Sequence, residues 1–264
     1  MFDRNESGFS IQLSIMSMDL DKAKLQITKK TKALMYVSLN GRSDDMKEVV
    51  DFCEDNNLLL IEDSAQSLGS FSNGNHLGTF GEFGSFSLST PKIISTGQGG
   101  IITTNNEELY ENIKKIKNFG RVKAGIDKHD IEGYNFKFSD FLAVIGIEQL
   151  KKLPERMKYK KNLFSKYYEL IKDRSEIQMI DTNLTDVTPW FVDIFSNKKE
   201  EIKNKLLANK IRTRDIYPPL TSQKFIDIDK SEYDNSYNVS RKGLWLPSGF
   251  DLTDEDIEYI VSKL

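Results

Sequence analysis

Hydrophobic and polar residues follow two different periods in the first part of the chain. An apolar run at residues 33–38 is typical of a strand. Residues 44–56 then carry apolar side chains at helical spacing, and a second, continuous apolar run follows at residues 58–61. Such a continuous run predicts a strand that is covered on both faces. Strand, helix and strand of these lengths predict a βαβ unit with parallel strands.

The same pattern continues with further strands and two helices. Strands are expected at residues 84–88 and 100–104, and residues 138–150 predict a buried helix with Ser139 as its N-cap. Pro154 marks a break, after which a long helix follows. We therefore expect a large α/β domain with a mostly parallel sheet in residues 1–152.

The pattern changes from about residue 186. Residues 187–195 and 211–217 read as strands, and a helix is expected between them at residues 199–210. A last helix begins after Thr253, which has an acidic residue three positions on, close to a capping box. Residues 153–264 are therefore predicted to form a long connecting helix and a smaller α+β domain.

Composition excludes several classes of function. The net charge of −3 gives no electrostatic support for binding nucleic acid. Cys53 is the only cysteine and there are two histidines, so the sequence predicts no internal disulfide and no metal site. No apolar run is long enough to cross a membrane, and the first ten residues lack the features of a signal peptide. We expect a cytoplasmic protein that does not bind membranes.

Asp63 and Gln66 directly follow the apolar run at residues 58–61. In parallel α/β sheets, ligands bind beyond the carboxyl ends of the strands, so Asp63 is a candidate ligand-binding residue. The alternative is that Asp63 only caps the next turn. Glu62 is next to Asp63 in the predicted strand, so its side chain should point to the other face.

Lys92 lies between hydroxyl residues and a glycine cluster, in the stretch SFSLSTPKIISTGQGGIITTN at residues 85–105. Most lysines are solvated surface charges, and that is the alternative reading here. A lysine amine on a fixed, polar loop is, however, the usual nucleophile of Schiff-base chemistry. The neighbouring glycines match neither the Rossmann fingerprint nor the P-loop, so they indicate tight turns and close packing instead.

Asp63, Ser87 and Lys92 together suit pyridoxal phosphate as a cofactor. The carboxylate can keep the pyridine nitrogen protonated, so that the ring accepts electrons. The serine hydroxyl can donate a hydrogen bond to the phosphate, and the lysine can form the covalent link.

The sequence also resembles the nucleotide-sugar aminotransferases that use pyridoxal phosphate, the DegT/StrS group of fold type I. The resemblance runs from about Thr28 to the C-terminus, and it is carried by three blocks in the right order. These blocks are IEDSAQSLGS, HLGTFGEFGSFSLSTPKIISTGQGGIITTN and GYNFKFSDFLAVIGIEQL. The resemblance implies a fold-type I large domain followed by a small C-terminal domain.

The resemblance also implies roles for five residues. Asp63 would pair with the pyridine nitrogen, Gln66 would contact the ring hydroxyl, and Ser87 would bind the phosphate. Lys92 would form the Schiff base and move protons. Asn135 would reach the phosphate of the cofactor held mainly by the other subunit, which implies a homodimer with shared active sites.

Three further segments, SLNGRSDDM, KIISTGQGG and GLWLPSG, are similar to the perosamine-synthase type within this family. That type transfers an amino group from glutamate to a nucleotide-linked 4-keto-6-deoxyhexose, in amino-sugar biosynthesis for surface polysaccharide. Arg212, Arg214 and Tyr217 lie where such proteins contact the substrate, or they are surface residues of an edge strand. Amination at C3 rather than C4 stays open.

Members of this family have a substantial segment before the point where MFDRNESGFS begins. That segment supplies strands of the large domain, a Gly-Ser/Thr pair for the phosphate and an aromatic ring that stacks on the pyridine. We therefore expect an N-terminally truncated chain, which is either a fragment or one that a second polypeptide completes. The alternative function is a catalytically silent remnant or partner subunit of an intact aminotransferase. A sugar dehydratase is disfavoured, because dehydratases of this family have histidine in place of Lys92.

Overall fold

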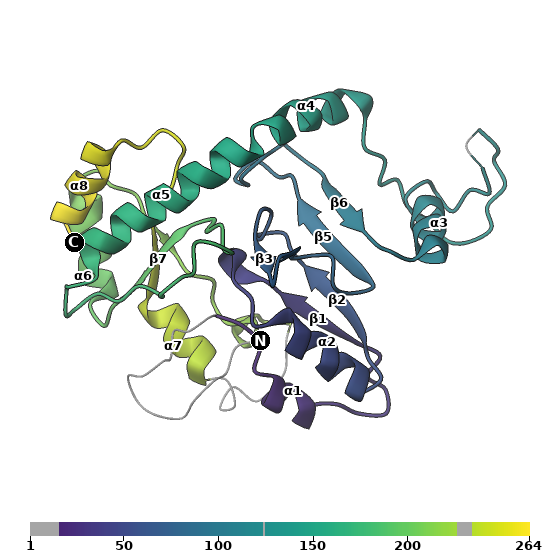
Figure 1. Cartoon of the computed structure of the whole chain (residues 1–264), viewed down its shortest axis with the longest axis horizontal. Coiled ribbons are helices and arrows are strands. Elements are labelled where there is room, and N and C mark those ends of the chain that lie inside the picture. Colours follow the sequence, from purple (N-terminus) through teal and green to yellow (C-terminus); the bar gives the residue numbers. More distant parts are fainter. Residues whose placement is uncertain (1–15, 124, 226–233) are drawn as a thin grey trace.

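The structure, a computed structural model, describes residues 16–123, 125–225 and 234–264 (Figure 1). The helices and strands of the described residues are, in chain order, α1 Leu20–Leu25, β1 Ala33–Val37, the 3₁₀ helix η1 Leu39–Gly41, α2 Met46–Asp55, β2 Leu59–Asp63, β3 Phe71–Ser72, β4 Asn75–His76, β5 Phe83–Ser87, β6 Gly100–Thr103, α3 Glu107–Ile116, α4 Asp140–Lys151, α5 Leu153–Ile171, β7 Val192–Phe195, α6 Lys199–Ala208, β8 Arg214–Asp215, the 3₁₀ helix η2 Leu220–Ser222, α7 Asp234–Lys242, β9 Gly243–Leu246 and α8 Asp254–Ser262.

The first half of the chain forms a four-stranded sheet in the order β1-β2-β5-β6. β1, β2 and β5 run parallel, and β6 is antiparallel to β5. The predicted βαβ unit is confirmed, with α2 between β1 and β2. α2 lies beside the sheet (Figure 1), and its buried side chains Met46, Val49 and Cys53 pack in one cluster with Tyr36 and Leu60 of the sheet.

The opposite face of this sheet is largely exposed. Met35, Leu59 and Ile102 keep 58%, 53% and 56% of their surface accessible. The prediction that the strand at 58–61 is covered on both faces is therefore wrong for Leu59. Side chains alternate along a strand, so Leu59 points away from α2, to a face that the described residues leave open. A continuous apolar run shows that both faces are apolar, and it does not show what covers them.

The apolar side of helix α4 is also exposed. Ser139 is its N-cap as predicted, accepting a hydrogen bond from the backbone N–H of Leu142. The prediction that the helix is buried is wrong, because none of its residues is buried among the described residues. Phe141, Val144 and Ile147 are 75%, 61% and 58% exposed. The helix leads directly into α5 (Figure 1), and the described residues leave these apolar side chains uncovered.

The second half of the chain packs around α5, which begins at the predicted break at Pro154. A three-stranded antiparallel sheet, ordered β7-β9-β8, lies against α5, α6 and α8 (Figure 1). Its core includes Tyr167 of α5, Ile194 of β7 and Leu244 of β9. The predicted capping box of α8 at Thr253 is confirmed. The strand predicted at 211–217 shrinks to the two residues of β8, and the domain boundary at residue 152 stays a prediction.

A buried ion pair joins the two halves. Arg42, just after η1, donates two hydrogen bonds of 2.7 and 2.9 Å to the carboxylate of Asp193 in β7. Their side chains are 2% and 0% exposed. Asn40 donates to the same carboxylate and to the backbone carbonyl of Phe191. Gly41 fits here because a Cβ would lie 2.5 Å from the carbonyl oxygen of Thr188. The junction is therefore close-packed and polar.

Among the described residues, no helix combines the length and the apolar composition that crossing a membrane requires. Residues 1–10, on which the prediction about a signal peptide rests, lie outside the described residues.

The junction predicts a large stability effect at Asp193. Replacing Asp193 by Asn should lower the free energy of unfolding by about 3–5 kcal/mol, because Arg42 would stay buried without its counter-charge. Urea denaturation followed by circular dichroism measures the change. The control is Asp51→Asn, which removes an exposed pair with Lys47. A loss at Asp193 no larger than in this control would contradict the assigned role of the ion pair.

Candidate functional site

Asp63 and Ser87 lie on one face of the four-stranded sheet, at its carboxyl-end edge. Asp63 is the last residue of β2 and pairs in register with Ser85 of β5. Ser87 is two residues further along β5, so its side chain points to the same face as that of Ser85. The structure therefore brings these two predicted residues to one edge, on the face opposite α2.

Asp63 also fulfils the alternative reading from the sequence. One of its carboxylate oxygens accepts a hydrogen bond of 3.1 Å from the backbone N–H of Ala65. This bond closes a small turn directly after β2. Asp63 therefore fixes the local backbone and still carries a negative charge that acts on Lys92.

Glu62 points to the other face, as predicted, and has a structural role that the sequence did not reveal. Its fully buried carboxylate accepts hydrogen bonds from the backbone N–H groups of Gly78, Phe80 and Gly81, at 2.6, 2.7 and 2.8 Å. The loop approaches the sheet so closely that a Cβ on Gly84 would lie 1.9 Å from the carbonyl oxygen of Gly78. The spaced glycines therefore permit close packing, as the sequence indicated.

Lys92 is a half-buried lysine, and the surface-charge alternative does not describe it. Its Nζ atom lies 3.8 Å from the centroid of the Trp190 ring. Burial lowers the pKa of the Lys92 amine to about 8, while the Asp63 carboxylate opposes this shift and the Arg214 guanidinium reinforces it. A substantial fraction of the amine is therefore neutral near pH 8, which is the form that attacks a carbonyl carbon.

The loop that carries Lys92 is tied down on both sides. The backbone N–H of Lys92 donates to the carbonyl of Ser89, whose hydroxyl lies 3.0 Å from the hydroxyl of Ser87. Ile93 is buried, and its carbonyl accepts a hydrogen bond from Arg156 of α5. Lys92 therefore extends from a fixed backbone, with two hydroxyl groups close to its loop.

Gln66 is held by the junction between the two halves. Its side-chain oxygen accepts a 2.9 Å hydrogen bond from the backbone N–H of Asn40. Asn40 has a left-handed backbone with φ 54°, and its side chain contacts Asp193 and Phe191. The position of Gln66 therefore depends on the same contacts that join β7 to the first sheet.

Arg214 and Tyr217 lie on the second half of the chain, and the charge of Arg214 acts on Lys92. The Arg214 guanidinium carbon is 5.4 Å from both the Tyr217 and the Trp245 ring centroids. Both residues are exposed, and Arg214 begins the edge strand β8. Arg212 is also exposed, two residues before that strand. Arg214 is thus an edge-strand residue, as one alternative had it, and its charge acts on Lys92. Contact of Arg212, Arg214 and Tyr217 with a substrate stays a prediction.

Asn135 is not part of this group. It is exposed, and its backbone forms an isolated bridge with Asn118 in the segment between α3 and α4. The part of that segment that carries Asn135 runs beside the end of α3 (Figure 1), and its last residues return toward the sheet, where Phe138 lies against Gly99. The role of Asn135 toward a cofactor of the other subunit stays a prediction.

Trp190 is the residue that the sequence analysis missed. Its ring faces the Lys92 amine, and its indole N–H donates a 2.6 Å hydrogen bond to the carbonyl of Pro91. Trp190 lies 98 positions from Lys92 along the chain, in a segment predicted to be a strand. Only the fold brings the two together, so no local signal could have identified the contact.

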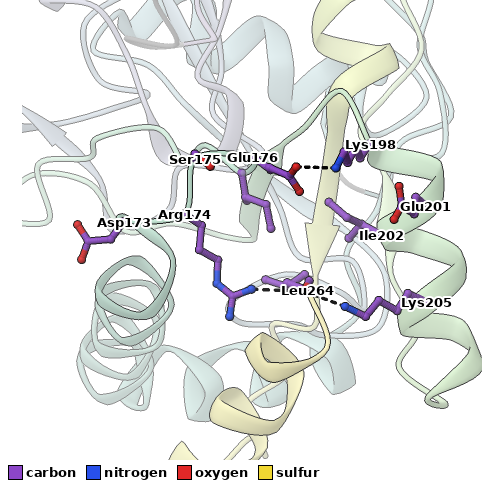
Figure 2. Close-up of a pocket in the computed structure, with 10 residues that line it drawn as sticks. Asp173, Arg174, Ser175, Glu176, Lys198, Glu201, Ile202, Lys205 and Leu264 are labelled. Atoms are coloured by element: carbon purple, nitrogen blue, oxygen red, sulfur yellow. Dashed lines mark hydrogen bonds and ion pairs between the residues drawn. The ribbon is translucent and has the colours of Figure 1, made fainter.

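A surface pocket of about 390 Å³ lies elsewhere, among the end of α5, α6 and the last residue Leu264 (Figure 2). Arg174 and Lys205 donate hydrogen bonds to the backbone oxygen of Leu264, and Lys198 pairs with Glu176. The charged groups of this pocket therefore largely pair with one another, and none of the predicted site residues lines the pocket.

The chain is similar to known proteins over nearly its whole length. Residues 10–264 match the model of the DegT/DnrJ/EryC1/StrS aminotransferase family. GDP-perosamine synthase of Escherichia coli O157:H7 is 30% identical over 94% of this chain and 68% of its own length. GDP-4-keto-6-deoxy-D-mannose 3-dehydratase of Yersinia pseudotuberculosis is 31% identical over 69% of this chain and 50% of its own length.

The fold is that of the fold-type I aminotransferases. The aminotransferase TlmJ from Streptoalloteichus hindustanus superposes with a TM-score of 0.89, at 22% identity, over 95% of this chain and 69% of its own.

The charges around Lys92 predict opposite pKa shifts in two variants. Asp63→Asn should lower the pKa of Lys92 below about 8, because a negative charge that favours the ammonium form is lost. Arg214→Gln should raise it, because a positive charge that disfavours that form is lost. Competitive labelling with trace acetic anhydride across pH, read by mass spectrometry, gives the pKa of Lys92. Shifts of the same sign in both variants would contradict the assigned arrangement.

Proposed function

The chain belongs to the DegT/DnrJ/EryC1/StrS aminotransferase family, and we propose that it transfers an amino group from glutamate to a nucleotide-linked 4-keto-6-deoxyhexose. Transamination of a nucleotide sugar follows from the family and from relatives named as GDP-perosamine synthases. The observation that carries the proposal is the half-buried Lys92 amine with a pKa of about 8, flanked by Asp63 and Arg214. The 4-keto position, the glutamate donor and a place in surface-polysaccharide synthesis are the finer parts of the proposal.

Pyridoxal phosphate is the cofactor of this enzyme. The residues present fit it chemically, because they combine an amine that is partly neutral, a carboxylate and two neighbouring hydroxyls at one sheet edge. When bound, the cofactor supplies a ring that accepts the electron pair left on carbon after a proton is removed.

Each side chain has a proposed task toward this cofactor. Lys92 Nζ would hold the cofactor covalently and would take and return the proton on the reacting carbon, a task for which a pKa close to the working pH is favourable. The Asp63 carboxylate would keep the pyridine nitrogen protonated. The Ser87 hydroxyl would donate to the phosphate, and Gln66, which Asn40 holds in place, would orient the ring hydroxyl.

On the substrate side, Arg214 and Tyr217 are the proposed contacts, with Arg212 nearby. The exposed guanidinium of Arg214 carries a positive charge toward the region of Lys92. Both glutamate and a sugar nucleotide bring negative charge, so this position favours their binding. The neighbouring Tyr217 and Trp245 rings meet edge to face at 4.9 Å and support the guanidinium.

We propose in addition that the enzyme is a homodimer with shared active sites. The support is the apolar outer side of α4, where Phe141, Val144 and Ile147 are more than half exposed, together with the exposed segment that carries Asn135. Contiguous exposed apolar patches commonly mark interfaces between proteins. In such a dimer, Asn135 reaches the site of the other subunit.

A sugar dehydratase and a silent partner subunit are the two alternative functions. The dehydratase of Yersinia pseudotuberculosis is also a relative, but dehydratases of this family are expected to carry histidine where this chain has Lys92. The second is a silent partner subunit, and it is favoured by the exposed face of the sheet on which Asp63 lies. Binding of the cofactor by the purified chain separates that function from transamination.

The cofactor proposal is tested by trapping. The purified chain, incubated with pyridoxal phosphate and then borohydride, should gain one covalent adduct on Lys92, which peptide mapping by mass spectrometry locates. Lys92→Ala should remove the adduct without changing the circular dichroism spectrum. Lys151→Ala, at an exposed lysine on α4, is the matched control and should keep it. A folded chain without an adduct would favour the silent partner subunit.

The dimer is tested by its mass in solution. Light scattering should give about twice the 30.3 kDa of the chain. Ile147→Glu should shift the chain to monomer, because it places a charge on the apolar side of α4. Leu25→Glu changes an equally apolar residue on α1 that is 83% exposed, and it should leave the mass unchanged. A wild-type chain that is monomeric at all concentrations would contradict the proposal.

A further inference from the structure

Trp190 contacts both the backbone and the side chain of the Lys92 segment. Its indole N–H donates to the carbonyl of Pro91, the residue before Lys92, at 2.6 Å. The face of the same ring lies 3.8 Å from Lys92 Nζ, a distance typical of a cation–π contact. The Trp190 side chain thus holds both the backbone next to Lys92 and the Nζ atom at the end of the Lys92 side chain.

Trp190 is itself held rigidly. It is 3% exposed, and its backbone carbonyl accepts a 3.0 Å hydrogen bond from Lys160 of α5. Lys160 is also buried and donates a second hydrogen bond, to the carbonyl of Ser248. The next residue, Phe191, exchanges hydrogen bonds with Asn40 through both its N–H and its carbonyl. These contacts come from three separate parts of the chain.

A column of rings continues from Trp190 toward the proposed substrate contacts. The Trp190 and Phe191 ring centroids are 4.0 Å apart, and those of Phe191 and Trp245 are 4.6 Å apart. Trp245 in turn contacts Tyr217 and Arg214. The ring that faces Lys92 is therefore the first member of a packed aromatic wall and cannot rotate independently.

From these contacts we propose that Trp190 is a positioning residue for Lys92, which holds the amine at the carboxyl end of the sheet and screens it from water. This inference rests on the proposed function, in which Lys92 is the reacting lysine. It adds to that function a second requirement, that the lysine be aimed by a side chain from the other half of the chain. Trp190 acts through Lys92 and is not itself a catalytic residue.

If Trp190 screens the Lys92 amine from water, removing its ring should change the pKa of Lys92 in a defined direction. Burial is the main cause of the lowered pKa of Lys92, and the ring of Trp190 covers the amine. A cation–π contact alone favours the ammonium form and would raise the pKa. Desolvation of the amine acts in the opposite direction and is the largest cause of the lowered pKa. Opening this side to water should therefore bring the pKa of Lys92 back toward the ordinary lysine value of 10.5.

The test is the pKa of Lys92 in three chains, measured by competitive labelling with acetic anhydride without any cofactor. Trp190→Leu removes the ring and the N–H, and the pKa of Lys92 should rise by about one unit or more. Trp190→Phe keeps a ring face and loses the N–H, so the pKa should stay near 8 while the melting temperature falls. The pKa of Lys160, measured in the same sample, reports whether the surrounding structure is preserved.

Two results overturn the proposal. One is an unchanged pKa of Lys92 in a folded Trp190→Leu chain. The other is an equal rise in Trp190→Leu and Trp190→Phe, which would show a purely structural effect of the missing hydrogen bond. Trapping with borohydride on the wild type separates this from the proposed function. If the wild type forms no adduct but the pKa shifts as expected, the positioning role holds and the function fails. If the wild type forms the adduct but the pKa of Lys92 does not shift in Trp190→Leu, the proposed function holds and the positioning role fails.

Discussion

The buried ion pair between Arg42 and Asp193 is the contact on which the site depends. It lies where the end of β1 meets β7, and both side chains are almost completely buried. Burying two charges is costly unless each is fully paired, which ties the two halves to one relative position. In that position Lys92, from the first half, meets Trp190 and Arg214 from the second.

Asn40 extends this constraint to the other site residues. It bonds to Asp193, to the backbone of Phe191 and to Gln66. A change at the junction is therefore transmitted along two short routes, one to Gln66 beside Asp63 and one to Trp190 beside Lys92. The chain combines a rigid site with apolar surfaces on the sheet and on α4 that the described residues leave exposed.

Local patterns predicted the elements of this fold well, because periodicity and capping are local properties. The βαβ unit, the N-cap Ser139 and the capping box at Thr253 are all confirmed. Burial was predicted less well. Leu59 and the apolar side of α4 read as core but are exposed, since hydrophobicity shows what a surface prefers and not what lies against it.

The site residues also differ in whether the sequence could predict them. Asp63 and Lys92 could be predicted because a strand end and an unusual loop mark them in the sequence. Trp190 and Glu62 could not, since a tryptophan in an apolar segment and a glutamate in a strand look ordinary until the fold shows what they contact. Residues whose role depends on long-range contacts carry no local signal.

The Arg42–Asp193 junction sets the environment of Lys92. The most direct test is the pKa of Lys92 in the Asp193→Asn chain, measured by competitive labelling well below its melting temperature. This dependence predicts that the pKa of Lys92 rises from about 8 toward 10.5, because a loosened junction moves Trp190 away from the amine. A pKa that stays near 8 while the chain is clearly destabilised would contradict it.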